Sequence, residues 1–185
     1  SYNDYMKLDR SARYKVVINS NFNENGNLNY GEILIPGESQ EEIMFSTYIC
    51  HPQMCNNELS GPAVWSEIVK HVINMKNRKY TYRFVIAPET IGSIVYISKN
   101  INTLKDRVIA AFNLTCVGDD RCFSYLPSRK GNTYSDKIAK FILDTTIGEY
   151  NSYTWLDKGS DERQYCAPGV DIPMCSIMRS KFKEY

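Results

Sequence analysis

The sequence predicts an α/β fold, a three-layer αβα sandwich built around a mainly parallel sheet. Two observations predict it. Short apolar runs rich in β-branched residues alternate with longer segments of helical periodicity, and most of these runs are too continuously apolar to face water on either side. The chain has 185 residues, of which 43% are hydrophobic and 23% charged, which suffices for a core without disulfides. We therefore expect a single domain over residues 1–185.

The elements follow from the apolar patterns in chain order. The main parallel strands are predicted near residues 43–50, 82–87, 108–117 and 172–178. Shorter strands are predicted at 122–128 and 153–157. Helices are predicted near 61–76, 91–100 and 134–147. The first of them has Ser60 as its N-cap and Pro62 in its first turn, both of which favour a helix start.

An N-terminal β-hairpin is predicted at one edge of the sheet. The β-rich runs 14–22 and 28–36 are separated by Asn25-Gly26, a strong hairpin signal. The predicted core consists of apolar residues from the strands and helices: Trp65, Ile68, Val69, Phe84, Ile86, Ile109, Phe112, Ile138 and Phe141.

The composition excludes several classes of partner. Lys and Arg number 22 against 21 Asp and Glu, a net charge of +1 without a basic tract, so neither nucleic acid nor an anionic membrane is an expected partner. No apolar run approaches the roughly 20 residues of a membrane span. Six cysteines without a CxxC pair indicate reduced thiols and a cytoplasmic protein. The chain lacks an initial Met and ends in charged sequence, so we expect a fragment; its oligomeric state is not predicted.

Potential ligands and acids gather in the loops that follow the predicted strands. In open α/β sheets, ligands bind where the carboxyl ends of the strands meet. The residues there lie at 51–57, 88–89, 115–120, 157–163 and 179. Taken singly, each has an ordinary structural explanation: His51 as a turn residue, Glu89 as a helix N-terminal carboxylate, and Asp161 with Glu162 as a solvated turn.

Taken together, these loops resemble a known family. "NNELSGPAV", "APETIGS", "FNLTCVG" and "GSDERQYCAPGVDIP" are similar, in order, to the metal-site segments of the co-catalytic zinc aminopeptidases, the group that includes the glutaminyl cyclases. "TYICHP", "NELSGP", "PETIGS", "LPSRKGNT" and "GSDERQY" further resemble a bacterial aminopeptidase-like branch found with polysaccharide biosynthesis genes. The resemblance spans nearly the whole chain and implies the αβα peptidase fold.

The resemblance also implies a metal site, although this sequence differs from the family at several of the metal-binding positions. His51 corresponds to a zinc ligand, Glu89 to a zinc ligand or the general base, and Asn57 to the Asp that bridges two ions. Asn57, Thr115 and Glu162 stand where the family has Asp, Asp and His, and Pro88 stands where it has a second Glu. These losses of carboxylate ligands favour one zinc ion over two. We expect the zinc site to be incomplete in this chain, because the resembled family carries a further ligand His at a position beyond residue 185.

The expected activity is that of a zinc-dependent aminopeptidase-like hydrolase acting on a peptide or amide bond of a small substrate. Glu89 is the candidate base for water, unless it ligates the metal. Asp161 and Arg163 are candidates to hold a charged substrate terminus, or form a salt bridge within their loop.

Two other functions remain open at this point. The lost carboxylates favour a catalytically impaired binding module that recognises an amino sugar, a peptide or a partner in polysaccharide assembly. A cysteine hydrolase would use Cys50 or Cys55 beside His51, but neighbouring residues of a strand point to opposite faces, so Cys50 and His51 are not expected to pair. His71 is expected on a helix surface.

If the family resemblance extends to the site, four side chains should converge. We predict that His51, Asn57, Glu89 and Thr115 lie at one carboxyl edge of the sheet, close enough for a single ion to touch more than one of them. Positions on opposite edges would remove the basis for a metal site.

Overall fold

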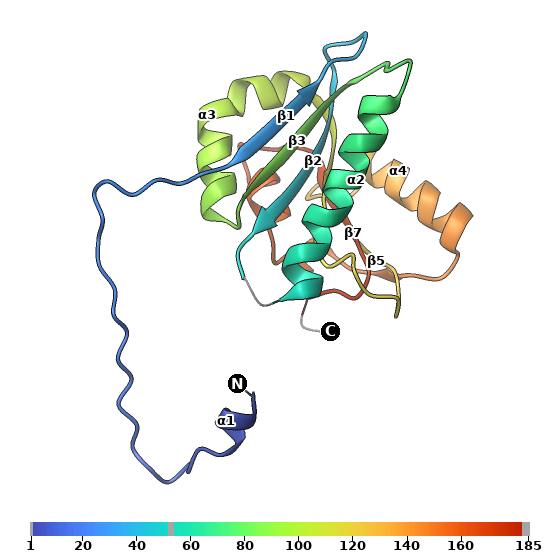
Figure 1. Ribbon diagram of the computed structural model, residues 1–185. Helices are drawn as coiled ribbons and strands as arrows, with labels where there is room; N and C mark the ends of the chain where they lie inside the picture. The colour runs from blue at the N-terminus through green and yellow to red at the C-terminus, as the bar shows by residue number, and fades with distance from the viewer. Residues whose placement is uncertain (1, 52–53, 183–185) are drawn as a thin grey trace.

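A mixed seven-stranded sheet forms the centre of the computed structural model, which describes residues 2–51 and 54–182 (Figure 1). In chain order its strands are β1 (Gly31–Ile35), β2 (Glu42–Ile49), β3 (Thr81–Pro88), β4 (Val108–Asn113), β5 (Ser124–Leu126), β6 (Asn151–Ser152) and β7 (Met174–Met178). Their spatial order is β1-β3-β2-β4-β7-β5-β6. The central strands β3, β2, β4 and β7 run parallel, whereas β1 is antiparallel to β3 and β5 is antiparallel to β7. The predicted fold class is confirmed.

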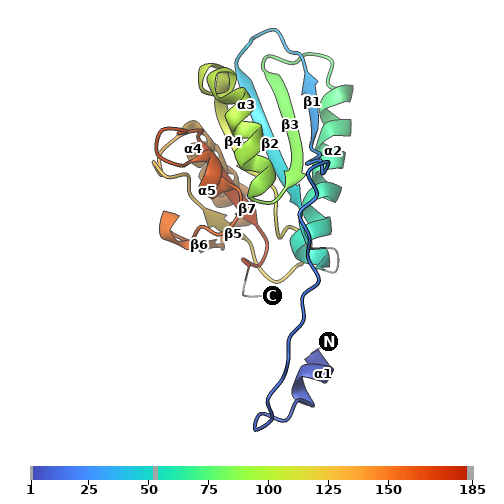
Figure 2. The same cartoon turned by 90° about the vertical axis from the view of Figure 1, so that its left-hand side faces the viewer.

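Helices cover both faces of the sheet. The helices are α1 (Tyr2–Met6), α2 (Ser60–Asn74), α3 (Ile91–Arg107), α4 (Tyr134–Ile142) and α5 (Glu162–Tyr165), with π-helical turns η1 (Cys55–Leu59) and η2 (Leu143–Ile147) and a 3₁₀ turn η3 (Trp155–Asp157). Figures 1 and 2 show α2 and α4 on one face and α3 and α5 on the other. No helix in the described part of the chain is both long and apolar enough to cross a membrane.

The strands are continuously apolar because both of their faces are buried. Phe84 and Val85 follow one another on β3, and both are 0% exposed. Phe84 packs with α2, whereas Val85 belongs to the cluster formed with α3 and α5. On the α2 side, the ring of Phe45 stacks between those of Phe84 and Phe112, with centroid distances of 5.3 and 5.6 Å. The core therefore consists of two layers separated by the sheet.

The predicted N-terminal hairpin is wrong. Residues 14–22 form no strand; Ile18 is 80% exposed and Phe22 fully exposed, and the segment belongs to an arm that leads away from the sheet in Figures 1 and 2. The Asn25-Gly26 signal produces only a turn, closed by the bond from Gly26 N to Asn23 O. An isolated hairpin buries too little apolar surface to be stable in water. β1 instead pairs with β3, which places Ile35 in the core against α2.

The strand predicted at 153–157 is also wrong. Only Asn151–Ser152 pairs, and the chain then turns into η3. The carboxylate of Asp157 accepts hydrogen bonds from Thr154 N at 3.0 Å and Thr154 Oγ1 at 2.8 Å, which is a capping box. The pattern Thr-x-x-Asp was the sequence signal for this helical turn.

Helix α4 buries a different face from the one that its apolar residues predict. Phe141 is 68% exposed, whereas Asp136 and Ala139 are buried. The carboxylate of Asp136 accepts hydrogen bonds from Ser128, Thr133 and Tyr125. This network directs the face of α4 that carries Asp136 toward the sheet, and Phe141 toward solvent. Of the other predicted core residues, Val69 and Phe84 are buried, and the rest are only partly so: Trp65, Ile68, Ile86, Ile109, Phe112 and Ile138.

A buried ion pair joins the edge of the sheet to α3. Arg83 of β3 is 5% exposed and donates to both carboxylate oxygens of Glu42, which is 0% exposed. The same guanidinium also reaches Glu32 of β1 and, at 3.0 Å, the hydroxyl of Tyr96 on α3. Removing one partner of a buried pair leaves an uncompensated charge, which costs more than an exposed pair contributes.

We predict that Glu42→Gln lowers the free energy of unfolding by about 3 kcal/mol, because Arg83 keeps its burial and loses its main counter-charge. Urea denaturation measures this loss. The matched control is Glu67→Gln, since Glu67 pairs with Lys70 on the exposed surface of α2 and should change little. Equal effects of the two substitutions would contradict the assignment.

Candidate functional site

The carboxyl ends of the four central parallel strands meet at one edge of the sheet. β2 ends at Ile49, β3 at Pro88, β4 at Asn113 and β7 at Met178. His51, Asn57, Glu89 and Thr115 follow three of these ends and share this edge, as hydrogen bonds and electrostatic contacts among them and their neighbours demonstrate. The predicted placement of all four residues at one carboxyl edge is therefore correct. Their predicted spacing around a single ion stays a prediction, because His51 is grouped within 4.8 Å with Cys50 and Glu58 and not with Glu89.

A buried carboxylate organises the loop after β2. Glu58 of η1 is 3% exposed, and its Oε1 lies 2.8 Å from Nδ1 of His51. Its other oxygen accepts the backbone N–H of Cys50. His51 itself is 53% exposed. Glu58 thus holds two consecutive residues in place while the imidazole of His51 stays open to solvent.

Cys50 and His51 do come together, against the expectation from strand geometry. β2 ends at Ile49, so the alternation of side chains no longer applies to the next two residues. Cys50, His51 and Glu58 each offer a ligand atom, and these atoms all lie within 4.8 Å of one another. Sequence reasoning missed Cys50 and Glu58 as ligand candidates, although Glu58 was visible as an acid directly before a helix start.

Asn57 and Thr115 form a neutral hydrogen-bond network with Tyr48. The hydroxyl of Tyr48 donates to Oδ1 of Asn57 at 3.2 Å and lies 2.5 Å from Oγ1 of Thr115. Burial raises the pKa of Tyr48 well above its usual range, so this hydroxyl stays protonated. The family resemblance puts metal-binding Asp residues at the positions of Asn57 and Thr115. Here those positions hold neutral groups that each interact with the hydroxyl of Tyr48.

Glu89 lies beside the Cys50–His51 cluster. Burial raises the pKa of its carboxyl group, and the negative charge of Glu58 acts in the same direction. Hydrogen bonds from the side chains of Ser160 and Cys50 to Glu89 oppose the shift, as does the charge of His51. A partly buried carboxylate with a raised pKa is a stronger base than a free carboxylate, and therefore better suited to accept and return a proton.

Asp161 holds the loop that carries Glu89. Its Oδ1 accepts hydrogen bonds from Thr90 N at 2.8 Å and Ser93 Oγ at 3.0 Å. Thr90 has a φ of 64°, a left-handed conformation that is unfavourable for a β-branched residue and needs such support. Asp161 is 0% exposed, and burial raises its pKa to about 7. Its role as a substrate-binding residue stays a prediction.

Glu162 and Arg163 differ in exposure. Glu162 is 1% exposed, and its carboxylate accepts from Gly159 N, Ser160 N and the side-chain amide of Asn113 at 2.9–3.0 Å. Glu162 therefore ties its loop to the end of β4. Arg163 is exposed and reaches Thr90 Oγ1 at 3.5 Å. Its guanidinium is thus accessible at the side of the loop that carries Glu89.

Several buried polar atoms near these loops have no hydrogen-bond partner among the described residues. They are Asn113 Oδ1, Asp161 Oδ2 and Ser176 Oγ. Buried polar groups are nearly always satisfied in folded proteins, by water or ligands where the protein itself provides nothing. Unsatisfied groups at this edge are consistent with a site that takes up water, an ion or substrate.

The Ser-Gly pair that starts α2 permits close packing at this edge. A Cβ on Gly61 would lie 2.4 Å from both Leu114 O and Thr47 Oγ1, so only glycine fits between the ends of β2 and β4. The hydroxyl of Ser60 accepts from Val117 N at 3.0 Å. The helix start is thereby fixed against the loop that carries Thr115.

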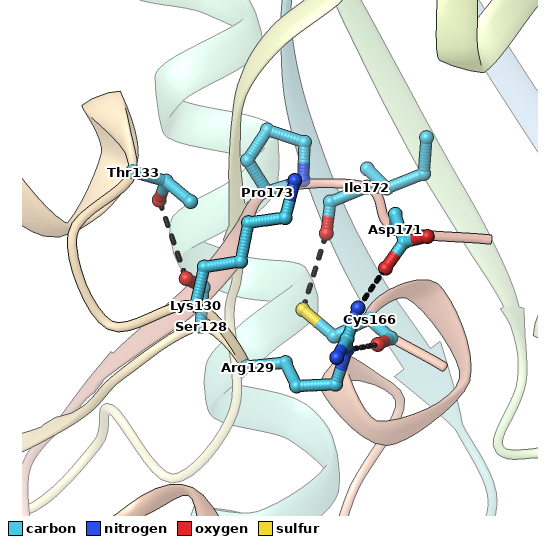
Figure 3. Close-up of a pocket in the computed structure, with 8 residues that line it drawn as sticks. All are labelled: Ser128, Arg129, Lys130, Thr133, Cys166, Asp171, Ile172 and Pro173. Atoms are coloured by element: carbon cyan, nitrogen blue, oxygen red, sulfur yellow. Dashed lines mark hydrogen bonds and ion pairs between the residues drawn. The ribbon is translucent and has the colours of Figure 1, made fainter. Parts of the chain in front are cut away.

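A cavity lies at the opposite edge of the sheet. It has a volume of about 140 Å³ and lies between the start of α4 and the start of β7. Figure 3 shows the guanidinium of Arg129 directed to Asp171 and to the backbone oxygen of Cys166, with Thr133 bonded to Ser128. These polar groups bind one another, so the conspicuous "LPSRKGNT" segment has a structural role here.

The titration of Asp161 should make the stability of the protein depend on pH. An acid whose pKa is raised on folding, here from 3.8 to about 7, makes the folded state lose stability relative to the unfolded state as pH rises through that window. Asp161→Asn keeps an oxygen acceptor for Thr90 and Ser93 without the charge. With a chelator present, we predict that the variant gains on the order of 4 kcal/mol relative to wild type between pH 4 and 8. A constant difference in denaturation free energy across this range would contradict the assignment.

Comparison with known proteins gives the family. A family model described as "Domain of unknown function (DUF4910)" matches residues 14–185. A Clostridium acetobutylicum protein, named as a proposed polysaccharide biosynthesis protein with an aminopeptidase-like domain, is 45% identical over 167 residues. The match covers 90% of this chain but 38% of that protein, so the chain spans well under half of its relative's length.

Two solved structures share the fold. A crystal structure of a proposed peptidase from Clostridium acetobutylicum has a TM-score of 0.79 at 42% identity, covering 83% of this chain and 36% of that one. An aminopeptidase from Aneurinibacillus sp. strain AM-1 has a TM-score of 0.64 at 16% identity, covering 82% and 38% of the two chains. This chain belongs to the DUF4910 family and has the α/β fold of the aminopeptidases.

Proposed function

We propose that the chain carries the metal-binding part of a zinc-dependent aminopeptidase-like hydrolase, which cleaves a peptide or amide bond of a small substrate. The main support is the convergence of His51 and Glu89 at one carboxyl edge of an aminopeptidase fold. The solvent-exposed imidazole can ligate a metal, and the partly buried carboxylate can move a proton.

The residues at this edge fit one zinc ion better than two. A bridged pair of cations needs carboxylates, whereas Asn57 and Thr115 are neutral and bond to Tyr48. The side of the edge formed by Cys50, His51 and Glu58 has sulfur, nitrogen and oxygen donors, the atom types that zinc prefers. A bound zinc would supply a Lewis acid that favours attack of water on an amide carbonyl.

The chain's own residues would then divide the remaining work. Glu89 would accept a proton from the attacking water and return it to the leaving amine. Asp161 holds the Thr90 turn, and with it the position of Glu89. Arg163, which is exposed beside the same turn, would bind a carboxylate of the substrate. The six cysteines are free thiols, which supports our proposal of a cytoplasmic protein.

The competing proposal is a binding module on a peptidase fold, with the same edge recognising a peptide or an amino sugar without cleavage. The neutral Asn57–Tyr48–Thr115 network favours it, because that network removes ligands that a binuclear peptidase needs. Metal content and turnover separate the two proposals.

The test uses the longest natural form of the protein that contains these residues, assayed for release of amino acids from a peptide library. We predict that Glu89→Gln lowers kcat by about 10²–10⁴-fold without loss of zinc, because the amide cannot take the proton of water. His51→Ala should lose both zinc and activity. His71→Ala on α2 is the matched control for His51 and should change neither. A zinc-free, inactive wild-type protein would favour the binding module.

A further inference from the structure

The loop after β2 contains a donor set that the family resemblance does not assign. We propose that Cys50, His51 and Glu58 together bind one zinc ion, with the thiolate of Cys50 as a ligand. This inference rests on the proposed function, because it concerns the same metal. It assigns ligands other than Asn57 and Glu89, and leaves Glu89 available as the base.

The three donors are already assembled. Their ligand atoms lie within 4.8 Å of one another, and Nδ1 of His51 is 2.8 Å from Oε1 of Glu58. Donor atoms around a tetrahedral zinc ion lie roughly 3.3–3.6 Å apart, given bond lengths of about 2.0–2.3 Å. An ion would thus take the place of the proton between His51 and Glu58 after a small separation of the two side chains.

The negative charge of the buried Glu58 carboxylate would be stabilised by a nearby cation. Its carboxylate is 3% exposed, and in the described part of the chain its ion-pair partner is His51, which carries a charge only when protonated. Buried carboxylates in proteins are paired with cations or bind metals. The adjacent Glu89 adds a second negative charge near the thiol. A divalent cation among these groups would compensate both carboxylates.

The donor types distinguish this site from that of the resembled family. A thiolate, an imidazole and a carboxylate are three protein ligands of the kinds zinc uses in catalytic sites, with a fourth position left for water or substrate. Binding releases the proton of the Cys50 thiol to solvent, since only the thiolate ligates. Asn57 is not needed, because its oxygen accepts the hydrogen bond of Tyr48.

Cobalt(II) titration of the 185-residue chain tests the proposal, because a thiolate ligand gives cobalt a near-ultraviolet charge-transfer band that nitrogen and oxygen ligands do not. The wild-type chain should bind one cobalt ion with this band, and zinc should displace it. Cys50→Ser should abolish the band and weaken binding by at least 10-fold, the lower end of the loss typical even of outer-shell changes. Cys55→Ser, another exposed cysteine outside the cluster, should leave the band intact.

Two further variants separate this inference from the proposed function. Glu58→Gln should weaken binding, with circular dichroism checking that the variant folds, whereas Glu89→Gln should keep both the metal and the band. Two outcomes would overturn the inference without contradicting the proposed metal-dependent hydrolase. In the first, the wild-type chain binds cobalt without the charge-transfer band. In the second, Glu89→Gln loses cobalt whereas Cys50→Ser keeps it. A wild-type chain that binds no cobalt would also overturn it. Peptidase activity of the longer protein tests the function separately.

Discussion

The carboxylate of Glu58 is the contact on which the candidate site depends. It reaches from η1, just before α2, back to the backbone of Cys50 and the imidazole of His51 beyond the end of β2. The start of α2 is itself held against β4, because Gly61 allows an approach that a Cβ would prevent. The position of His51 relative to Glu89 and Thr115 therefore follows from packing of the sheet as well as from its own short loop.

The two halves of the edge differ in charge. One half combines Cys50, His51, Glu58 and Glu89, which are ionisable. The other half combines three neutral side chains, in which Tyr48 hydrogen-bonds to both Asn57 and Thr115. This asymmetry favours our proposal of a single cation on the ionisable side, because a second cation would lack a carboxylate on the neutral side. The buried carboxylates of Asp161 and Glu162 stabilise the loops around the site, because they accept hydrogen bonds from the backbone N–H groups of Thr90 and Gly159.

The sequence was sufficient for the parallel strands, since runs buried on both faces carry an unambiguous signal. It failed where local and tertiary preferences conflict. Residues 14–22 have strand composition but lack a partner, and Phe141 has helical spacing but lies opposite the face that Asp136 anchors. At the site, His51 and Glu89 could be found from motif order. Cys50 could not, because its orientation depends on where β2 ends, and periodicity does not locate strand ends to a single residue.

Anomalous X-ray diffraction at the zinc edge, from crystals of the zinc-loaded chain, tests the central claim most directly because it locates the ion without reference to activity. The account predicts one peak, within bonding distance of Cys50 Sγ, an imidazole nitrogen of His51 and a carboxylate oxygen of Glu58, with Glu89 adjacent but not bonded. A peak bonded to Asn57 and Glu89, or two peaks bridged between them, would contradict it.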